Sequence, residues 1–255
     1  MAYQQEVIKP YNQDERKGSQ VEKMFDNIAP TYDRLNHTLS LGIDRLWRNK
    51  AIDALGKYFP SKEGQGVLLD IATGTGDFAI LAARRLKPEH VTGADISLEM
   101  MEIAAHKVNQ QGLERTISFQ RQDCMNLTFD DNSFDAVTVA YGARNFESLD
   151  QGLREILRVL KPGGHLLMLE LASPKSFPMK QLFWIYSHVV IPFVGWIFSR
   201  DVKAYNYLSD SVNAFPQGEV MERILKKNGY NKVVWRRFTF GICTMYLAEK
   251  LNIEN

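Results

Sequence analysis

Apolar runs alternate with amphipathic stretches along the chain after residue 40. Short runs rich in Val, Ile, Leu and Phe predict strands near 67–72, 91–95, 117–121, 134–140 and 164–171. Apolar positions at helical spacing predict helices at about 77–87, 98–111 and 148–160, the last of them stopped by Gly163 and Gly164. Such alternation is typical of a parallel sheet that is covered by helices on both faces.

The pattern changes towards the C-terminus. A helix is expected at about 217–228, ended by Asn228 and Gly229, and the segments "KVVWRRF" and "GICTMYLAEK" follow as strands. The link between these two strands is too short for a crossover helix, so they are expected to pair antiparallel.

The most apolar stretch is Leu182 to Phe198, "LFWIYSHVVIPFVGWIF", which has no formal charge. It falls short of the roughly 20 apolar residues that a membrane span needs, and His188, Pro192 and Gly195 interrupt it. Two interpretations remain open, a core or cap helix and an apolar lid over an apolar substrate.

Composition narrows the class of protein. The 255 residues include 31 Lys and Arg against 30 Asp and Glu, a formal charge of +1 that argues against nucleic acid as the main partner. The two cysteines, Cys124 and Cys243, match no metal spacing and fit a reduced chain. The polar N-terminus has no apolar signal core, so we expect a cytoplasmic protein whose residues 1–20 are flexible and poorly ordered.

The stretch "DIATGTGD", Asp70 to Asp77, follows a predicted strand and opens a predicted helix. Gly74 and Gly76 suit a tight turn that brings backbone close to a ligand. With Ala79 they match a dinucleotide pattern, yet a carboxylate at Asp77 would repel a pyrophosphate at this helix start. S-adenosylmethionine has no phosphate and carries a sulfonium and an ammonium, which Asp70 and Asp77 are expected to face.

Two further acids follow the next two strands. Asp95 is expected to accept hydrogen bonds from ribose hydroxyls. Asp123 is expected to accept a hydrogen bond from the adenine amino group, and the Cys124 amide to donate one to a ring nitrogen of adenine. Each acid has an alternative role as a helix cap or turn residue. Because open α/β sheets bind ligands at the carboxyl ends of their strands, the set favours a class I S-adenosylmethionine-dependent methyltransferase fold: a seven-stranded, mostly parallel sheet with an antiparallel last strand.

With these residues placed, the chain resembles the quinone-biosynthesis C-methyltransferases, the family of demethylmenaquinone methyltransferase and polyprenyl-benzoquinol methylase. The resemblance covers residues 21–249 and is carried by "VEKMFDNIAPTYDRLNHTLSLGIDRLWR", "LDIATGTGD" with "GADIS", "YGARN" and "RVLKPGGHLLMLE". It implies cofactor contacts at Thr75, Asp95, Asp123 and Cys124. Asp44, Ala140 and Ala172 depart from the usual pattern.

The resemblance implies a single domain over 21–255, with an N-terminal helical cap (21–60) and a lid insertion (174–212). It also implies methylation of a ring carbon of a polyprenylated quinol. The cofactor is expected to be S-adenosylmethionine, and no metal is expected in the site. Demethylmenaquinol is favoured, and a benzoquinol stays open. Peripheral contact with the membrane and a homodimer also stay open.

Arg144, with Asn145 beside it, is the first candidate for the reacting ring, to stabilise a quinolate or orient a water; its alternative is a structural salt bridge. Tyr32 and Asn36 are candidates for binding substrate. A histidine such as His188 is more often a hydrogen-bonded residue of a cap than a base.

Two other functions remain as alternatives, a nicotinamide oxidoreductase and a non-catalytic scaffold for other quinone enzymes.

Overall fold

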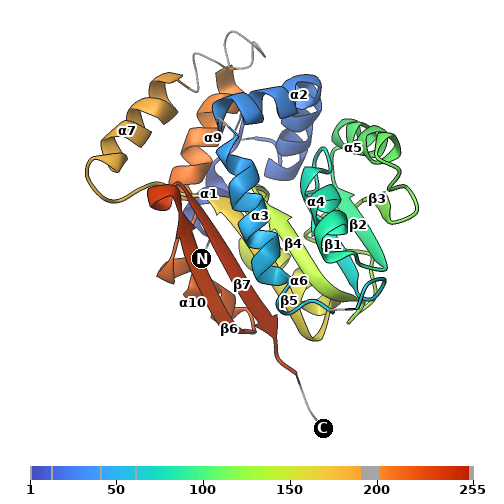
Figure 1. Ribbon diagram of the computed structural model, residues 1–255. Coiled ribbons are helices and arrows are strands. Elements are labelled where there is room, and N and C mark those ends of the chain that lie inside the picture. The colour runs from blue at the N-terminus through green and yellow to red at the C-terminus, as the bar shows by residue number, and fades with distance from the viewer. Residues whose placement is uncertain (1, 13, 41, 61, 191–201, 253–255) are drawn as a thin grey trace.

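A computed structural model describes residues 2–12, 14–40, 42–60, 62–190 and 202–252. Its centre is a seven-stranded sheet in the order β3-β2-β1-β4-β5-β7-β6 (Figure 1). The strands are β1 (Val67–Ile71), β2 (His90–Asp95), β3 (Ile117–Arg121), β4 (Phe134–Ala140), β5 (Leu160–Leu171), β6 (Tyr230–Phe238) and β7 (Cys243–Lys250). Strands β1 to β5 pair parallel, and β7 runs antiparallel to both β5 and β6. The predicted fold class is confirmed.

The helices with α labels are α1 (Gln4–Val7), α2 (Lys17–Leu39), α3 (Ile43–Leu55), α4 (Asp77–Leu86), α5 (Leu98–Gln110), α6 (Leu149–Val159), α7 (Met179–Ile185), α9 (Val202–Ala214) and α10 (Glu219–Lys227). Short helical turns add η1 (Ala143–Asn145), η2 (Tyr186–Val190) and η3 (Thr239–Gly241). Those predicted from the apolar periodicity fall within two residues of their expected bounds, because their buried positions recur at helical spacing.

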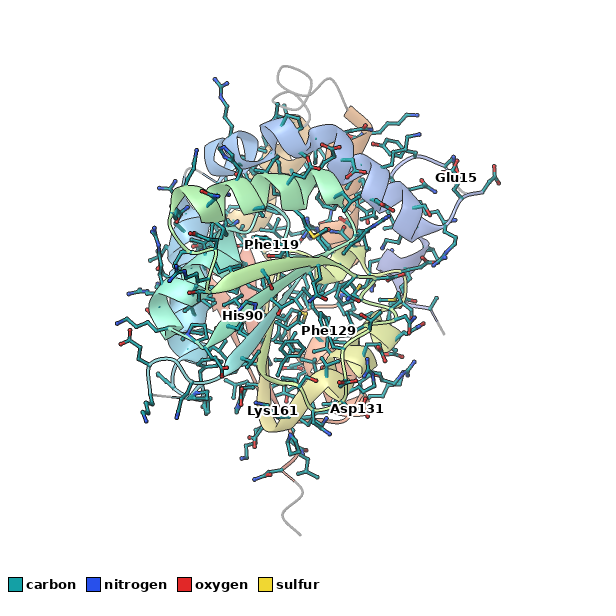
Figure 2. All side chains as sticks on the ribbon, turned by 90° about the vertical axis from the view of Figure 1, so that its right-hand side faces the viewer. Glu15, His90, Phe119, Phe129, Asp131 and Lys161 are labelled. Carbon is teal, nitrogen blue, oxygen red and sulfur yellow. The ribbon has the colours of Figure 1, made fainter. Side chains whose placement is uncertain are left out.

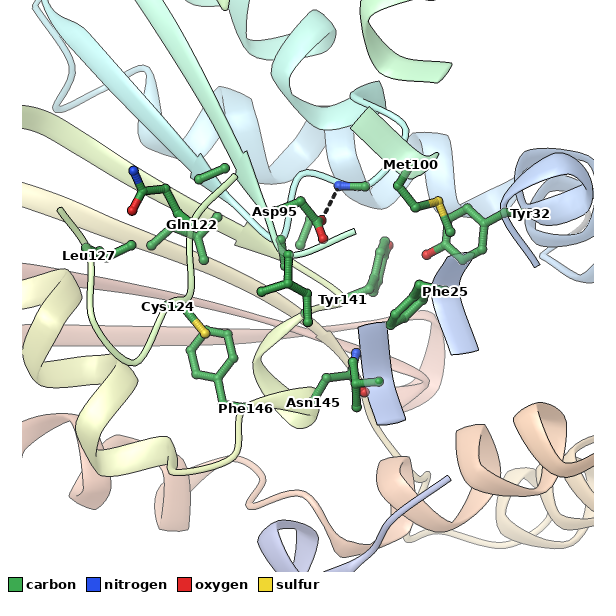
Figure 3. A pocket seen from close by; sticks show the side chains of 18 residues that line it. Phe25, Tyr32, Asp95, Met100, Gln122, Cys124, Leu127, Tyr141, Asn145 and Phe146 are labelled. Carbon is green, nitrogen blue, oxygen red and sulfur yellow. Dashed lines mark hydrogen bonds between the residues drawn. The ribbon is translucent and has the colours of Figure 1, made fainter. Parts of the chain in front are cut away.

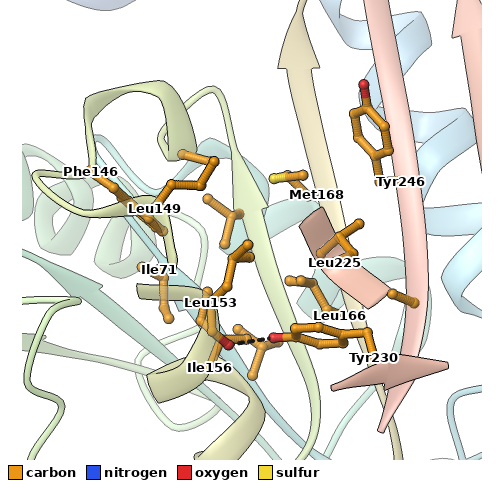
Figure 4. Close-up of a cluster of buried hydrophobic side chains, with 14 of the residues drawn as sticks. Ile71, Phe146, Leu149, Leu153, Ile156, Leu166, Met168, Leu225, Tyr230 and Tyr246 are labelled. Atoms are coloured by element: carbon orange, nitrogen blue, oxygen red, sulfur yellow. Dashed lines mark hydrogen bonds between the residues drawn. The ribbon is translucent and has the colours of Figure 1, made fainter. Parts of the chain in front are cut away.

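Each face of the sheet has its own apolar core. One face packs against α6 and α10, in a cluster that includes Leu153, Ile156 and Leu225 (Figure 4). The other packs against α3 and α4, in a cluster that includes Ile52 and Ala79. Helix α3 is therefore a covering helix of the sheet, so the predicted cap of residues 21–60 divides into α2, above the carboxyl edge, and α3, on the face.

The segment expected to form a lid contains α7, η2 and α9. A small third cluster, with Met24 and Val21 of α2 and Tyr207 of α9, joins the lid to the N-terminal helix. Residues 191–198 of the apolar stretch lie outside the described residues. Within the described chain, no helix combines the length and the apolar character that crossing a membrane requires.

The N-terminal residues differ from the expected loose segment. The Glu6 carboxylate accepts a hydrogen bond from the Leu149 amide at 2.7 Å, at the start of α6. The Lys17 ammonium is buried and donates to the backbone carbonyls of Gln5 at 2.6 Å and Arg144 at 3.1 Å. These side chains attach the N-terminal segment to the start of α6 and to the backbone of Arg144, although Asp14, Glu15 and Arg16 between them stay exposed.

We expect Lys17→Met to lower the free energy of unfolding by about 1–3 kcal/mol, because two buried carbonyls lose their donor. Urea denaturation followed by circular dichroism measures the change. Lys23→Met is the control, since Lys23 is exposed on the same helix and should shift stability by less than about 0.5 kcal/mol. Equal stability of the two variants would contradict an anchored N-terminus.

Candidate functional site

The loop between β1 and α4 begins the site. Gly74 has φ +54° and Gly76 has φ +78°, in the left-handed region that glycine adopts most readily. A Cβ added to Gly76 would also meet the Cβ of Ala104 on α5 at 3.0 Å. The predicted tight turn is therefore present, and it brings backbone to the carboxyl end of β1.

A cavity of about 80 Å³ lies at this edge (Figure 3). The carboxyl ends of β1, β2 and β4, the loop after β3 and helix α2 enclose it, with Tyr32 and Phe25 on the side of α2. Three of the predicted cofactor residues, Gly74, Asp95 and Cys124, line it. The cavity therefore lies where ligands bind in open α/β sheets.

Asp95 ties two loops together at the floor of this cavity. Its Oδ2 accepts the Gly74 amide at 2.8 Å, and its Oδ1 accepts the Ser97 amide at 3.0 Å. Burial raises the pKa of Asp95 above its usual range, against the effect of these amides. The carboxylate thus holds the glycine loop and also faces the cavity.

Asp70 lies beneath the loop and is not among the residues that line the cavity. It accepts hydroxyl hydrogen bonds from Thr73 at 2.7 Å and Thr138 at 2.6 Å. Burial raises the pKa of Asp70 to about 6. The structure thus gives Asp70 a supporting position under the glycine loop.

Three other predicted residues point elsewhere. Asp123 is exposed, and its Oδ1 accepts the Met125 amide at 2.9 Å, which is the alternative turn role. Thr75 donates its hydroxyl to Asp33 of α2. Asp77 does not line the cavity, and the expectation that it faces a cationic ligand is wrong in this structure, because two cations of the protein already hold its carboxylate.

These two cations and two carboxylates form a network of ion pairs, called the charged seam below, which consists of Lys107, Arg48, Asp77 and Asp33. The Lys107 ammonium pairs with Asp77 and, at 2.9 Å, with Asp33 of α2. The Arg48 guanidinium of α3 pairs with Asp77 at 2.9 Å. On balance these cations lower the pKa of Asp77, although its burial acts in the opposite direction. The seam therefore connects α2 and α3 to α4 and α5.

A second cavity, of about 360 Å³, adjoins the first. Helices α2, α3, α7 and α9 supply most of its walls, and most of the lining is apolar. The predicted residues Tyr32, Asn36, Arg144 and Asn145 all line it. The two cavities share wall residues, which are Phe25, Tyr32, Tyr141 and Asn145. A group bound in one cavity therefore lies beside a group bound in the other.

Arg144 forms the structural salt bridge that was its predicted alternative, and its role at the reacting ring stays a prediction. It is 6% exposed, and its guanidinium pairs with the buried Glu170 at 3.1 Å, the structural salt bridge. The Glu170 carboxylate also accepts the Arg144 amide at 3.2 Å. Within the described chain, Nε of Arg144 has no hydrogen-bond partner, and the side chain lines the second cavity. One buried nitrogen of this cation therefore has no hydrogen-bond partner among the described residues.

Sequence reasoning used Tyr141 only as part of the motif "YGARN". Its φ of +60° is unusual for a tyrosine, and its ring forms part of the shared wall, with the Arg48 guanidinium 5.5 Å from the ring centre. Its buried hydroxyl lies against the Cys243 thiol, and burial raises the pKa of that hydroxyl well above its usual range. Gln122, next to Asp123, also lines the first cavity and was not predicted. The position of Tyr141 directly after β4 was the signal available for it.

Two further predictions concern His188 and the absence of a metal. The side chain of His188 lies outside the described residues. In the part of the chain that the structure describes, His, Cys, Asp and Glu form no cluster of three that could hold a metal ion.

The model of the ubiE/COQ5 methyltransferase family matches residues 12–250. The chain belongs to this family. The predicted class of enzyme, a methyltransferase that takes its methyl group from S-adenosylmethionine, is confirmed, which sets aside the oxidoreductase alternative.

Two curated relatives illustrate the likeness. The chain is 57% identical to the demethylmenaquinone methyltransferase of Bacteroides fragilis over 250 residues, which cover 98% of this chain and 100% of the relative. It is 42% identical to the ubiquinone/menaquinone biosynthesis C-methyltransferase UbiE of Geotalea daltonii, over 92% of this chain and 97% of the relative.

Solved structures share the fold at low identity. The [4+2]-cyclase SpnF has a TM-score of 0.66 at 19% identity, over 92% of this chain and 96% of its own. A possible histamine N-methyltransferase from Thermotoga maritima has a TM-score of 0.63 at 17% identity, over 90% and 99% of the two chains. These similarities support the class I methyltransferase fold.

The acids that follow β2 and β3 are expected to contribute differently to the affinity for S-adenosylmethionine. We expect Asp95→Ala to raise the Kd for S-adenosylmethionine about 10- to 150-fold, the equivalent of a lost hydrogen bond to a charged group. Asp123→Ala, at an exposed turn, should change it less than about threefold. Isothermal titration calorimetry measures both, and a larger effect at Asp123 than at Asp95 would reverse the assignment.

Proposed function

We propose that this enzyme transfers a methyl group from S-adenosylmethionine to a ring carbon of a polyprenylated quinol, with demethylmenaquinol as the substrate. The observation that carries the proposal is the shared wall of the two cavities, which sets a large apolar chamber directly beside the cofactor edge of the sheet. The names of the curated relatives, one of which includes both quinones, support the same substrate class.

In this proposal S-adenosylmethionine takes the first cavity. Asp95 accepts from the ribose hydroxyls, the glycine loop passes beside the methionine part, and adenine lies by Gln122 and Cys124. Asp70, whose pKa is about 6, is ionised at neutral pH and adds negative charge below the glycine loop. This charge favours the sulfonium and ammonium groups of the cofactor on that side. Phe25 and Tyr32 of α2 cover the cofactor from above.

The quinol ring would lie in the second cavity, against the shared wall. A ring made electron-rich by loss of a hydroxyl proton attacks the sulfonium methyl in line, so that the new C–C bond forms as the S–CH₃ bond breaks. The ring carbon then loses its proton and aromaticity returns. Because an anion and a cation neutralise one another in this step, a closed site that holds both reactants aligned favours it.

Arg144 is the group that would stabilise the quinolate. Glu170 and the carbonyl of Tyr141 hold its guanidinium, while Nε stays without a partner among the described residues. Arginine stays protonated at neutral pH, so it supplies charge and orientation while the base is a water or another group. Asn145, whose Oδ1 accepts the Tyr207 hydroxyl at 3.1 Å, keeps its place in the shared wall.

The prenyl tail would extend between α7, α9 and α2, where apolar side chains such as Phe183, Leu208 and Leu39 line the cavity. This gives the 174–212 insertion the lid role that the sequence left open. We also propose that the enzyme works in the cytoplasm, at the inner face of the membrane that holds such substrates.

Arg144 must be tested without leaving a buried charge alone. We expect the pair Arg144→Gln with Glu170→Gln to lower kcat about 100- to 1000-fold, the usual cost of removing a charge-stabilising donor, with the Kd for S-adenosylmethionine unchanged. Circular dichroism reports the fold of the double variant, in which neither buried charge is left without its partner. Full kcat in the folded double variant would leave Arg144 a structural residue only.

The substrate is tested by transfer of labelled methyl to chemically reduced demethylmenaquinone, run beside the demethylated benzoquinol, with mass spectrometry to place the methyl on carbon. We expect transfer to the naphthoquinol, and a KM that rises strongly as the prenyl chain is shortened, because less apolar surface is buried. Transfer to both would extend the activity to two pathways. Transfer to the benzoquinol alone, or to neither, would contradict the proposal.

A further inference from the structure

Helix α7 and the turn η2 are apolar on two opposite sides. Met179, Phe183 and Tyr186 line the second cavity. The outer side carries exposed apolar side chains, and none of the seven residues of α7 is buried. The exposed residues that do not line the cavity are Trp184, 57%, Ile185, 50%, and Val189, 56%, and Phe177, 82% exposed, lies two residues before α7.

The segment that carries these side chains is cationic. Lys175 and Lys180 are exposed, and the chain from 171 to 190 contains no Asp or Glu. In Figure 1, α7 stands away from the sheet at the edge of the molecule. The outer side of α7 therefore presents apolar side chains, including two aromatic ones, next to lysines.

This combination fits the surface of a bilayer better than water. A contiguous apolar patch on a soluble protein usually marks an interaction site, and aromatic side chains with neighbouring lysines suit the boundary between headgroups and acyl chains. Helix α7 is far shorter than a membrane span, so it would lie along the surface. Anionic lipid headgroups complement the lysines.

We propose that Phe177, Trp184, Ile185 and Val189, with Lys175 and Lys180, form a docking surface for a bilayer that contains anionic lipid. This inference rests on the proposed function, in which the prenylated substrate resides in the membrane. The same helix forms the cavity wall on its inner side, so docking brings the cavity against the bilayer. The continuity between patch and cavity favours a lipid surface over a second copy of the chain, which would block that approach.

The test uses the full chain and vesicles of phosphatidylethanolamine with phosphatidylglycerol, without substrate. We expect the chain to sediment with the vesicles, and Phe177→Ser with Ile185→Ser to weaken this binding at least about tenfold, because two side chains no longer leave water. Neither residue lines either of the two cavities described above. The control is Leu98→Ser with Val234→Ser, at 51% and 56% exposed positions of α5 and β6, which should bind as the unchanged chain does.

Two further readouts separate docking from catalysis. Transfer of methyl to a short-chain quinol in solution should be unchanged in the Phe177/Ile185 variant, so its loss of vesicle binding would not reflect a damaged site. Lys175→Gln with Lys180→Gln should weaken binding to anionic vesicles and reduce its dependence on salt. Absent vesicle binding by the unchanged chain, or equal binding by all variants, would overturn the docking surface. So would a dimer in sedimentation equilibrium that the Phe177/Ile185 variant abolishes.

Discussion

Helix α2 lies above the carboxyl edge of the sheet and α3 packs on one face, and two cations, Lys107 and Arg48, pair with the carboxylate of Asp77 where these elements meet. Lys107 also reaches Asp33, so that one side chain of α5 connects α2 with α4. In this half-buried setting, removing one partner would leave the others poorly solvated and uncompensated. These ion pairs therefore help to hold α2, together with the hydrogen bond from the Ser97 hydroxyl to Asp26, and α2 forms a wall of both cavities.

The chemistry of the site depends on that wall. Tyr32 of α2 and, after β4, Tyr141 and Asn145 line both cavities, so the cofactor edge and the larger apolar chamber meet at these side chains. The left-handed backbone of Tyr141 turns its ring into this wall, and Glu170 from β5 holds Arg144 just beyond it. Transfer of a methyl group between two bound molecules needs this geometry, in which neither reactant has to leave its own pocket.

The sheet and its helices could be predicted from the sequence because each relies on local periodicity. The antiparallel β6 and β7, for example, followed from the short link between two apolar segments. The position of Gly74, Asp95 and Cys124 at the cavity could also be predicted, because the carboxyl ends of neighbouring parallel strands meet at one edge of the sheet.

Other residues depend on contacts between distant parts of the chain. Nothing near Asp77 indicates that Arg48 and Lys107 would hold it, so its expected place beside the ligand was wrong. The polar N-terminus looked loose because its partners, Leu149 and the carbonyl of Arg144, come more than a hundred residues later. The Asp123 carboxylate makes the turn contact that was its alternative, an orientation that the local sequence does not decide, and its contact with adenine stays a prediction.

A crystal structure of the enzyme with S-adenosylhomocysteine and a demethylated prenyl quinone bound together would test the central claim most directly. The account predicts that the cofactor sulfur and the unmethylated ring carbon face one another at the wall of Tyr32, Tyr141 and Asn145, with the tail beside α7. A quinone ring bound outside the larger cavity, or separated from the sulfur by that wall, would contradict it.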